Sequence, residues 1–290
     1  MIPAAFEYVA PRSVAEAVAL LRQHSYDAKV IAGGQSLIPM MRFRMAQPKV
    51  LVDIGRIPGL DYLREEDGYL RIGALVRHAT MEHSPLIQER YPLLAATARV
   101  VADPLVRNLG TVAGSLVHAD PAGDWAAAMM AARAQVVVAG PDGERVIGID
   151  DFLVDTFTTA LEPDELVVEV RVPIPGPRSG GDYQKIERKV GDFATAAVAV
   201  QVTLDEAGRC QQAGIGLCAV GPITLRAAAA EEALVGQPLD EATIRKAAAL
   251  AAEAAQPTSD TRGSAEYKRD MVRVLTIRAL RSAAARALKA

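Results

Sequence analysis

The chain has 290 residues, half of them apolar, and carries 32 basic against 35 acidic side chains, for a net charge of −3. It is long enough to bury one large core or two modest ones, and its balanced charge argues against the extended basic surface that holds nucleic acid. Its longest apolar stretches, such as residues 125–132, fall far short of the roughly 20 residues that span a bilayer, so no membrane span is expected.

The N-terminal residues 1–7 lack the ordered basic, apolar and cleavage segments of a secretory leader, and we expect a cytoplasmic protein. The two cysteines, Cys210 and Cys218, cannot by themselves ligate zinc or an iron–sulfur cluster, which needs about four ligands, and are predicted to be small core side chains. The four histidines show no His-x-x-x-His pairing. We therefore expect no metal site, and no cluster of histidines or carboxylates suggests a catalytic residue.

A small lobe is predicted over residues 1 to about 56. Ser13 and Glu16 match a capping box, and apolar residues at helical spacing then predict a helix over 13–23. A short strand over 29–31 runs into the glycine-bearing segment 32–36. The lobe is completed by an irregular or weakly helical stretch that is broken at Pro39 and by a second strand, over residues 37–45 and 50–54 respectively.

A second lobe is predicted from residue 57 to about 175. Its strands and helices are expected over 69–72, 135–139 and 165–173, and over 92–101 and 124–132. The proline- and glycine-rich segment 173–181 has the composition of a linker and marks the boundary between residues 175 and 176.

The region after this boundary is predicted to contain three strands followed by alanine-rich helices. The strands are expected over residues 183–189, 194–204 and 210–220. Five residues of the last helix share helical spacing and form a stripe that is predicted to pack on the sheet or on a partner: Tyr267, Met271, Val274, Leu275 and Arg278.

Two glycine loops carry the chemistry of the sequence, although neither is a dinucleotide or Walker fingerprint. Residues 32–36 follow a strand with Ala-Gly-Gly, which brings bare backbone amides together and lets a pyrophosphate approach closely. Residues 111–115 repeat this composition just before a helix, whose N-terminus favours negative charge. Either loop alone is more typical of a tight turn; together they predict a site for one diphosphate.

In order and spacing, several segments resemble the FAD-binding medium subunits of the molybdenum hydroxylase family, which includes xanthine dehydrogenase and aerobic carbon monoxide dehydrogenase, and the carbon monoxide dehydrogenase type most of all. These segments are 32–41, 50–54, 102–115, 120–124, 183–196 and 263–267. The likeness covers essentially the whole chain. It implies an α+β fold, in which a two-lobed FAD-binding domain of the PCMH or vanillyl-alcohol-oxidase type over 1–175 precedes a C-terminal domain over 176–290 with a small antiparallel sheet and helices.

The resemblance also implies a function. This chain would hold FAD and pass electrons from the [2Fe–2S] clusters of a small partner subunit to a quinone, NAD or oxygen. A large partner subunit would oxidise substrate at its molybdopterin cofactor, and the complex would be a dimer of heterotrimers. The alternatives are a self-sufficient FAD-dependent oxidoreductase and an assembly module without cofactor.

The same resemblance assigns cofactor-binding residues. The diphosphate would be held by the two loops, through Ala32, Gly33, Gly34, Gln35, Ser36, Thr111, Val112, Ala113, Gly114 and Ser115. Lys29 would add charge, Asp124 would contact the sugar-like chain, and Lys185 and Asp192 would border the flavin ring. From the residues alone, Asp124 is equally a helix N-cap, Lys185 a solvated strand residue and Asp192 a turn former.

The sequence departs from the family pattern in both loops. Family members often carry Gly-Gly followed by Asn or Asp where this chain has Ala113-Gly114-Ser115, and close relatives often have His in place of Gln35. Alanine allows less backbone freedom than glycine, and serine reaches less far than asparagine, so the altered second loop is the one feature that favours the module without cofactor.

Overall fold

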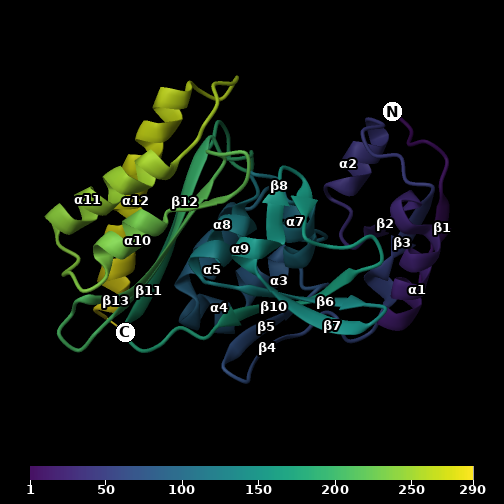
Figure 1. Cartoon of the computed structure of the whole chain (residues 1–290), viewed down its shortest axis with the longest axis horizontal. Coiled ribbons are helices and arrows are strands. Elements are labelled where there is room, and N and C mark those ends of the chain that lie inside the picture. Colours follow the sequence, from purple (N-terminus) through teal and green to yellow (C-terminus); the bar gives the residue numbers. More distant parts are fainter. Residues whose placement is uncertain (290) are drawn as a thin grey trace.

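The computed structural model describes residues 1–289, which form three regions in chain order (Figure 1). They contain no helix that is both long and apolar enough to cross a membrane. Both helices and sheets build every region, so the expected α+β class is confirmed.

The N-terminal lobe is a small parallel sheet with strand order β1 (Glu7–Val9), β3 (Val50–Asp53) and β2 (Ala28–Ile31), and its core includes α1 (Val14–His24). Ser13 caps α1 as predicted, because its Oγ accepts a hydrogen bond from the Glu16 amide at 3.1 Å. The predicted helix and two strands are thereby confirmed, and β1 is an additional strand that pairs with β3.

The prediction of a break at Pro39 is wrong. Residues Leu37–Arg42 form the helix α2, and Pro39 is its third residue. The amides of a helix's first turn have no intrahelical acceptor, so a proline there removes no hydrogen bond.

The middle region is built on an antiparallel sheet of five strands. Their order is β4 (Leu63–Glu66), β5 (Tyr69–Gly73), β10 (Leu166–Pro173), β6 (Gln135–Gly140) and β7 (Gly143–Gly148). The helices of this region are α3 (His78–His83), α4 (Pro85–Arg90), α5 (Pro92–Val100), α6 (Pro104–Arg107), α7 (Val112–His118), α8 (Asp124–Ala131) and α9 (Ile149–Phe152). A two-stranded ribbon follows, formed by β8 (Leu153–Asp155) and β9 (Thr158–Thr159).

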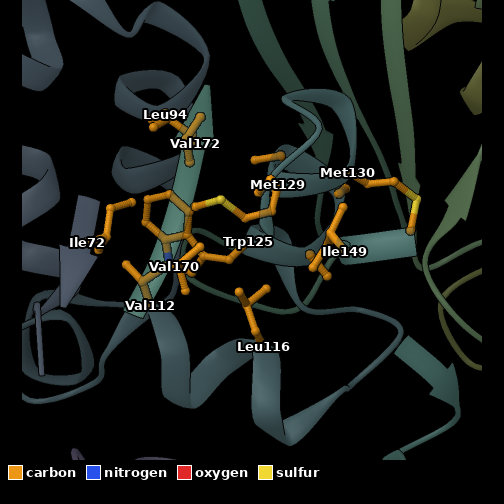
Figure 2. Close-up of a cluster of buried hydrophobic side chains, with 14 of the residues drawn as sticks. Ile72, Leu94, Val112, Leu116, Trp125, Met129, Met130, Ile149, Val170 and Val172 are labelled. Carbon is orange, nitrogen blue, oxygen red and sulfur yellow. The ribbon is translucent and has the colours of Figure 1, made fainter. Parts of the chain in front are cut away.

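Strand β6 shows why the first two regions form one body. Successive side chains of a strand point to opposite faces, so Val136 and Val138 join the core beneath the helices while Val137 and Ala139 join the core of the N-terminal lobe. On the helical side, the fully buried Trp125 of α8 lies among Ile72, Val170 and neighbouring apolar side chains (Figure 2). The central strands β6 and β10 are thus buried on both faces of the sheet.

The C-terminal region is an antiparallel sheet covered by helices. Its strands are β11 (Ser179–Ile186), β12 (Ala196–Leu204), β13 (Cys210–Cys218) and β14 (Leu225–Arg226), in that order, and its helices are α10 (Ala228–Leu234), α11 (Glu241–Ala254) and α12 (Ala265–Ala287). The three predicted strands are confirmed, and Cys210 and Cys218 are buried free thiols of β13, as predicted. The connection between β10 and β11 is shorter than expected, residues 174–178 rather than 173–181.

Two glycines let this sheet pack closely on α8. A Cβ at Gly214 would lie 1.9 Å from the carbonyl oxygen of Ala131, and one at Gly216 would lie 2.2 Å from that of Ala127. Because these neighbours are backbone atoms, only glycine permits this approach.

The predicted stripe on α12 is only partly correct. Leu275 is buried, but Tyr267 and Arg278 are exposed. The buried face instead includes Lys268, whose Nζ donates to the carboxylate of Asp260 at 2.7 Å. Because the buried face of α12 contains a lysine, a search for apolar residues at helical spacing does not identify this face correctly.

Candidate cofactor site

Two strand ends of the N-terminal lobe meet at one edge of its sheet. Strands β2 and β3 are parallel neighbours, so the first loop (residues 32–36), which follows β2, lies at the same edge as the turn Ile54–Arg56, which follows β3. The carboxyl edge of parallel strands is the usual place for a ligand in such a sheet.

The first loop touches the approach to the second loop (residues 111–115). A Cβ at Gly33 would lie 2.1 Å from the carbonyl oxygen of Leu109 and 2.7 Å from Cα of Gly110, so backbone meets backbone here. Gly34 follows with φ +70°, a conformation that favours glycine. The glycine pair is thus explained by a close approach and a left-handed turn, and it joins two segments far apart in the sequence.

Both loops line one cavity of about 450 Å³. The first loop contributes Ala32 and Gly33, and Thr111 lies opposite on the second loop. The rest of the lining comes from Leu109 and from two further segments, which supply Gly55, Arg56, Ile57, Pro58 and Asp61, and Leu75, Val76, Arg77 and Thr80. This places an open cavity where the sequence predicts the diphosphate.

The backbone amides of the first loop are available to a ligand. Among residues 1–289, the amides of Gly33, Gly34, Gln35 and Ser36 have no intramolecular acceptor, and the Gln35 side chain donates to the carbonyl of Gly33 at 3.1 Å. A run of unpaired amides is a ready anion site. The first loop therefore fits the diphosphate of FAD.

The second loop is different, because its amides are largely occupied. The Val112 amide donates to Val76 O at 3.1 Å, the Gly114 amide to Thr111 Oγ1 at 3.0 Å and the Ser115 amide to Thr111 O at 3.0 Å. Val112 and Ala113 bury their side chains, whereas Gly114 is exposed and Ser115 partly buried. These contacts leave fewer amides free in the second loop than in the first.

A buried histidine supports the approach to the second loop. The His78 amide donates to Gly110 O at 3.0 Å, and its ring accepts at Nδ1 from Trp125 Nε1 at 2.9 Å. Burial, aided by the positive charge of Arg107, lowers the pKa of His78 to about 4. His78 is therefore neutral near pH 7.

Asp124 and Lys185 form a buried ion pair between the middle and C-terminal regions. Asp124 Oδ2 lies 3.0 Å from Lys185 Nζ, and Asp124 Oδ1 accepts from the Tyr183 hydroxyl at 2.8 Å. Lys185 also donates to Val100 O at 3.0 Å and lies 3.3 Å from Glu187. Burial raises the pKa of Asp124, against the opposing effect of Lys185. The two predicted residues are thus in contact, and Lys185 is buried rather than solvated.

Asp192 lies in the turn between β11 and β12, next to Gly191. Its carboxylate pairs with Arg262 at 3.0 Å and Arg188 at 3.3 Å, and these partners hold the pKa of Asp192 well below its usual range. Gly191 packs against the backbone of Ala102, so this turn reaches the segment that leads to the second loop. Lys29 is exposed on β2, opposite Leu51.

Two arginines in the cavity lining, Arg56 and Arg77, were not identified from the sequence. Isolated arginines carry no local pattern. Their place in the same cavity lining as the glycine loops becomes visible only once the fold has brought these distant segments together.

Two family models match successive parts of the chain. Residues 4–175 match the family model described as the FAD binding domain in molybdopterin dehydrogenase, and residues 182–283 match that of the CO dehydrogenase flavoprotein C-terminal domain. The chain is similar to the carbon monoxide dehydrogenase medium chain of Hydrogenophaga pseudoflava, with 43% identity over 99% of both chains, and to the 6-hydroxypseudooxynicotine dehydrogenase complex subunit alpha of Paenarthrobacter nicotinovorans, with 40% identity over 99% of this chain and 97% of the relative.

The fold is similar as well. The solved carbon monoxide dehydrogenase from Hydrogenophaga pseudoflava superposes with a TM-score of 0.96 and 45% identity over 99% of both chains. Matches of this length include both glycine loops and the C-terminal sheet. The chain therefore belongs to the FAD-binding flavoprotein subunits of the molybdenum hydroxylase family and resembles the carbon monoxide dehydrogenase medium chains along its whole length.

Proposed function

We propose that this chain is the flavoprotein of a cytoplasmic three-subunit complex. A small subunit with [2Fe–2S] clusters delivers electrons to it, and a large molybdopterin subunit oxidises the substrate, in a dimer of heterotrimers. When bound, FAD would supply the redox chemistry that carries electrons from the clusters to an external acceptor. The observation that carries the proposal is the cavity that Ala32 and Gly33 of the first loop line together with Thr111 of the second loop, where the amides from Gly33 to Ser36 have no intramolecular acceptor among residues 1–289.

The protein's part is to bind and orient the cofactor. In this proposal, the first loop holds the diphosphate through the amides of Gly33 to Ser36, and Thr111 and Ala113 face it from the second loop. Lys29 adds positive charge at the entry of the first loop. Val112, Gly114 and Ser115 hold the second loop in shape through their own hydrogen bonds.

The C-terminal residues have a second role in the proposal. Lys185 and Asp192 border the flavin ring, and Asp124 contacts the sugar-like chain between ring and diphosphate. The ion pair between Asp124 and Lys185 holds these two groups in place, and the pairing of Asp192 with Arg262 holds the third. The division into a FAD-binding domain over 1–175, with lobes over 1–56 and 57–175, and a C-terminal domain over 176–290 is part of the same proposal.

In this proposal the choice of substrate lies with the large subunit and not with this chain. The relatives described above carry the names of a carbon monoxide dehydrogenase and a 6-hydroxypseudooxynicotine dehydrogenase, at 43% and 40% identity. This chain is almost equally identical to two relatives that are named for very different substrates. This similarity is consistent with substrate oxidation in the large subunit.

The first experiment combines an absorption spectrum of the chain purified from its host with a denaturing gel of its companions. We expect flavin bands near about 375 and about 450 nm, together with one small and one large companion. A yellow single chain that turns over a reductant and acceptor unaided would instead show a self-sufficient flavoenzyme. A colourless chain that cannot be reconstituted with FAD would favour the assembly module.

The second experiment tests the position of the site. Gly33→Val places a side chain against the backbone of Leu109 and Gly110, so it is expected to abolish FAD retention. Gly176→Ala is the control, because a Cβ there meets nothing within 4 Å. If Gly33→Val retained FAD as the control does, the diphosphate site would lie elsewhere.

A further inference from the structure

The diphosphate of FAD carries two negative charges, and the second loop offers few free amides for them. Three of its amides already donate within the chain, to Val76 O, Thr111 Oγ1 and Thr111 O. A phosphate that leaves water for a cavity must find equivalent partners there, because an unpaired buried charge is unfavourable. A side-chain cation opposite the first loop would supply them.

Arg77 is held opposite the start of the second loop. Its backbone forms an antiparallel bridge with Thr111, framed by hydrogen bonds from the His78 amide to Gly110 O and from the Val112 amide to Val76 O. Its guanidinium donates to Asn108 O at 2.9 Å. This bond orients the side chain along the approach to the loop and leaves its other N–H groups available.

Arg56 approaches the same cavity from the N-terminal lobe. It ends the turn that follows β3, beside the first loop, and no ion pair involves it among residues 1–289. Among the described residues that line the cavity, Arg56 and Arg77 are the cations and Asp61 is the one carboxylate. The lining therefore has a formal excess of one positive charge.

We propose that Arg77 binds the diphosphate of FAD from the side opposite the first loop, and that Arg56 adds to the positive field there. The inference rests on the proposed function and adds to it the residues that neutralise the cofactor. An arginine suits this role because its planar donor set matches phosphate oxygens and stays charged at every physiological pH.

The test measures the Kd of FAD for the full-length apo chain by quenching of flavin fluorescence, for the wild type and for Arg77→Gln, Arg77→Lys and Arg56→Gln. A charge-assisted hydrogen bond to phosphate predicts that Arg77→Gln raises Kd roughly 10- to 50-fold at low ionic strength. Arg77→Lys keeps the charge and is expected to bind more tightly than Arg77→Gln. Arg56→Gln is expected to raise Kd by a smaller factor than Arg77→Gln, because no hydrogen bond or ion pair within the described residues 1–289 orients the Arg56 side chain.

Salt dependence gives a second readout. Ionic screening weakens an attraction between charges, so Kd of the wild type is expected to rise more steeply with salt than Kd of Arg77→Gln. Arg22→Gln is the matched control: Arg22 is an exposed arginine of α1 that lies outside the cavity.

The two proposals fail differently. If Arg77→Gln raised Kd less than fivefold and kept the salt dependence of the wild type, Arg77 would not contact the diphosphate, and FAD binding itself would stand. If neither the wild type nor Arg22→Gln bound FAD, the proposed function would fail. Arg77 is exposed, so the variant is expected to fold, and a thermal melt of the apo chain checks this.

Discussion

Trp125 donates its indole N–H to Nδ1 of His78 across 2.9 Å, and both side chains are buried. An Nδ1 that accepts a hydrogen bond carries no proton, so the single proton of the neutral ring is on Nε2. That nitrogen faces Gly110, where a Cβ would lie only 2.7 Å away. The pair therefore packs against Gly110, the residue that precedes the second loop.

The first prediction concerns acid stability. Burial lowers the pKa of His78 from 6.5 to about 4, so between these values the unfolded chain takes up a proton that the folded chain does not. The contribution of His78 to the free energy of unfolding is complete above pH 6.5. It falls by about 3 kcal/mol as the pH drops towards 4. His78→Asn keeps an acceptor for Trp125 but does not titrate.

Denaturant unfolding at several pH values checks this. Wild type is expected to lose about 3 kcal/mol more than His78→Asn between pH 7 and pH 4, while the other histidines contribute equally to both. If the free energy of unfolding changed with pH in the same way in the two proteins, the fold would not keep His78 neutral.

The second prediction concerns the Asp124–Lys185 pair. Lys185→Met leaves the buried Asp124 carboxylate without its cation and is expected to lower the free energy of unfolding by about 3 to 5 kcal/mol. Burial already raises the pKa of Asp124, and loss of Lys185 raises this pKa further. The loss of stability caused by Lys185→Met should therefore become smaller as the pH falls and Asp124 takes a proton.

A double-mutant cycle separates this effect from lost packing. Asp124→Asn combined with Lys185→Met removes both charges and should be more stable than Lys185→Met alone. The cycle also needs Asp124→Asn measured alone, and a coupling energy of zero across the four proteins would show that the two charges are not coupled.

The third prediction concerns the contact between the middle and C-terminal regions. Gly216→Ala places a methyl group 2.2 Å from the Ala127 carbonyl oxygen of α8, so α8 and β13 must separate. We expect a loss of about 1 to 3 kcal/mol in chemical denaturation. Gly148→Ala in β7 meets only one ordinary contact at 3.7 Å and serves as the control. Equal stability of both variants would contradict the close packing.

Local signals in the sequence predicted much of the fold. The capping box at Ser13 located α1, and the apolar runs located β6 and the three long strands of the C-terminal sheet. These patterns act over a few residues and need no knowledge of distant partners. Pro39 misled because its effect depends on its position within the helix, which composition does not reveal.

The site was less predictable, because it is assembled from distant segments. Residue types suggested the two loops, but the contact between Gly33 and Leu109 depends on packing between the two lobes. The same holds for Arg77, which reaches the second loop through a bridge to Thr111. Asp124 and Lys185 were singled out only through family resemblance, and their ion pair spans 61 residues of sequence.

The alternation of side chains along β6 has a consequence for how the chain unfolds. Val137 and Ala139 belong to the core of the N-terminal lobe, while Val136 and Val138, one position away, belong to the helical core. The lobe cannot detach without exposing an apolar sheet face, so the two regions should melt in a single cooperative transition. Both glycine loops should then lose their structure in the same transition on heating, and no folded intermediate should retain one loop without the other.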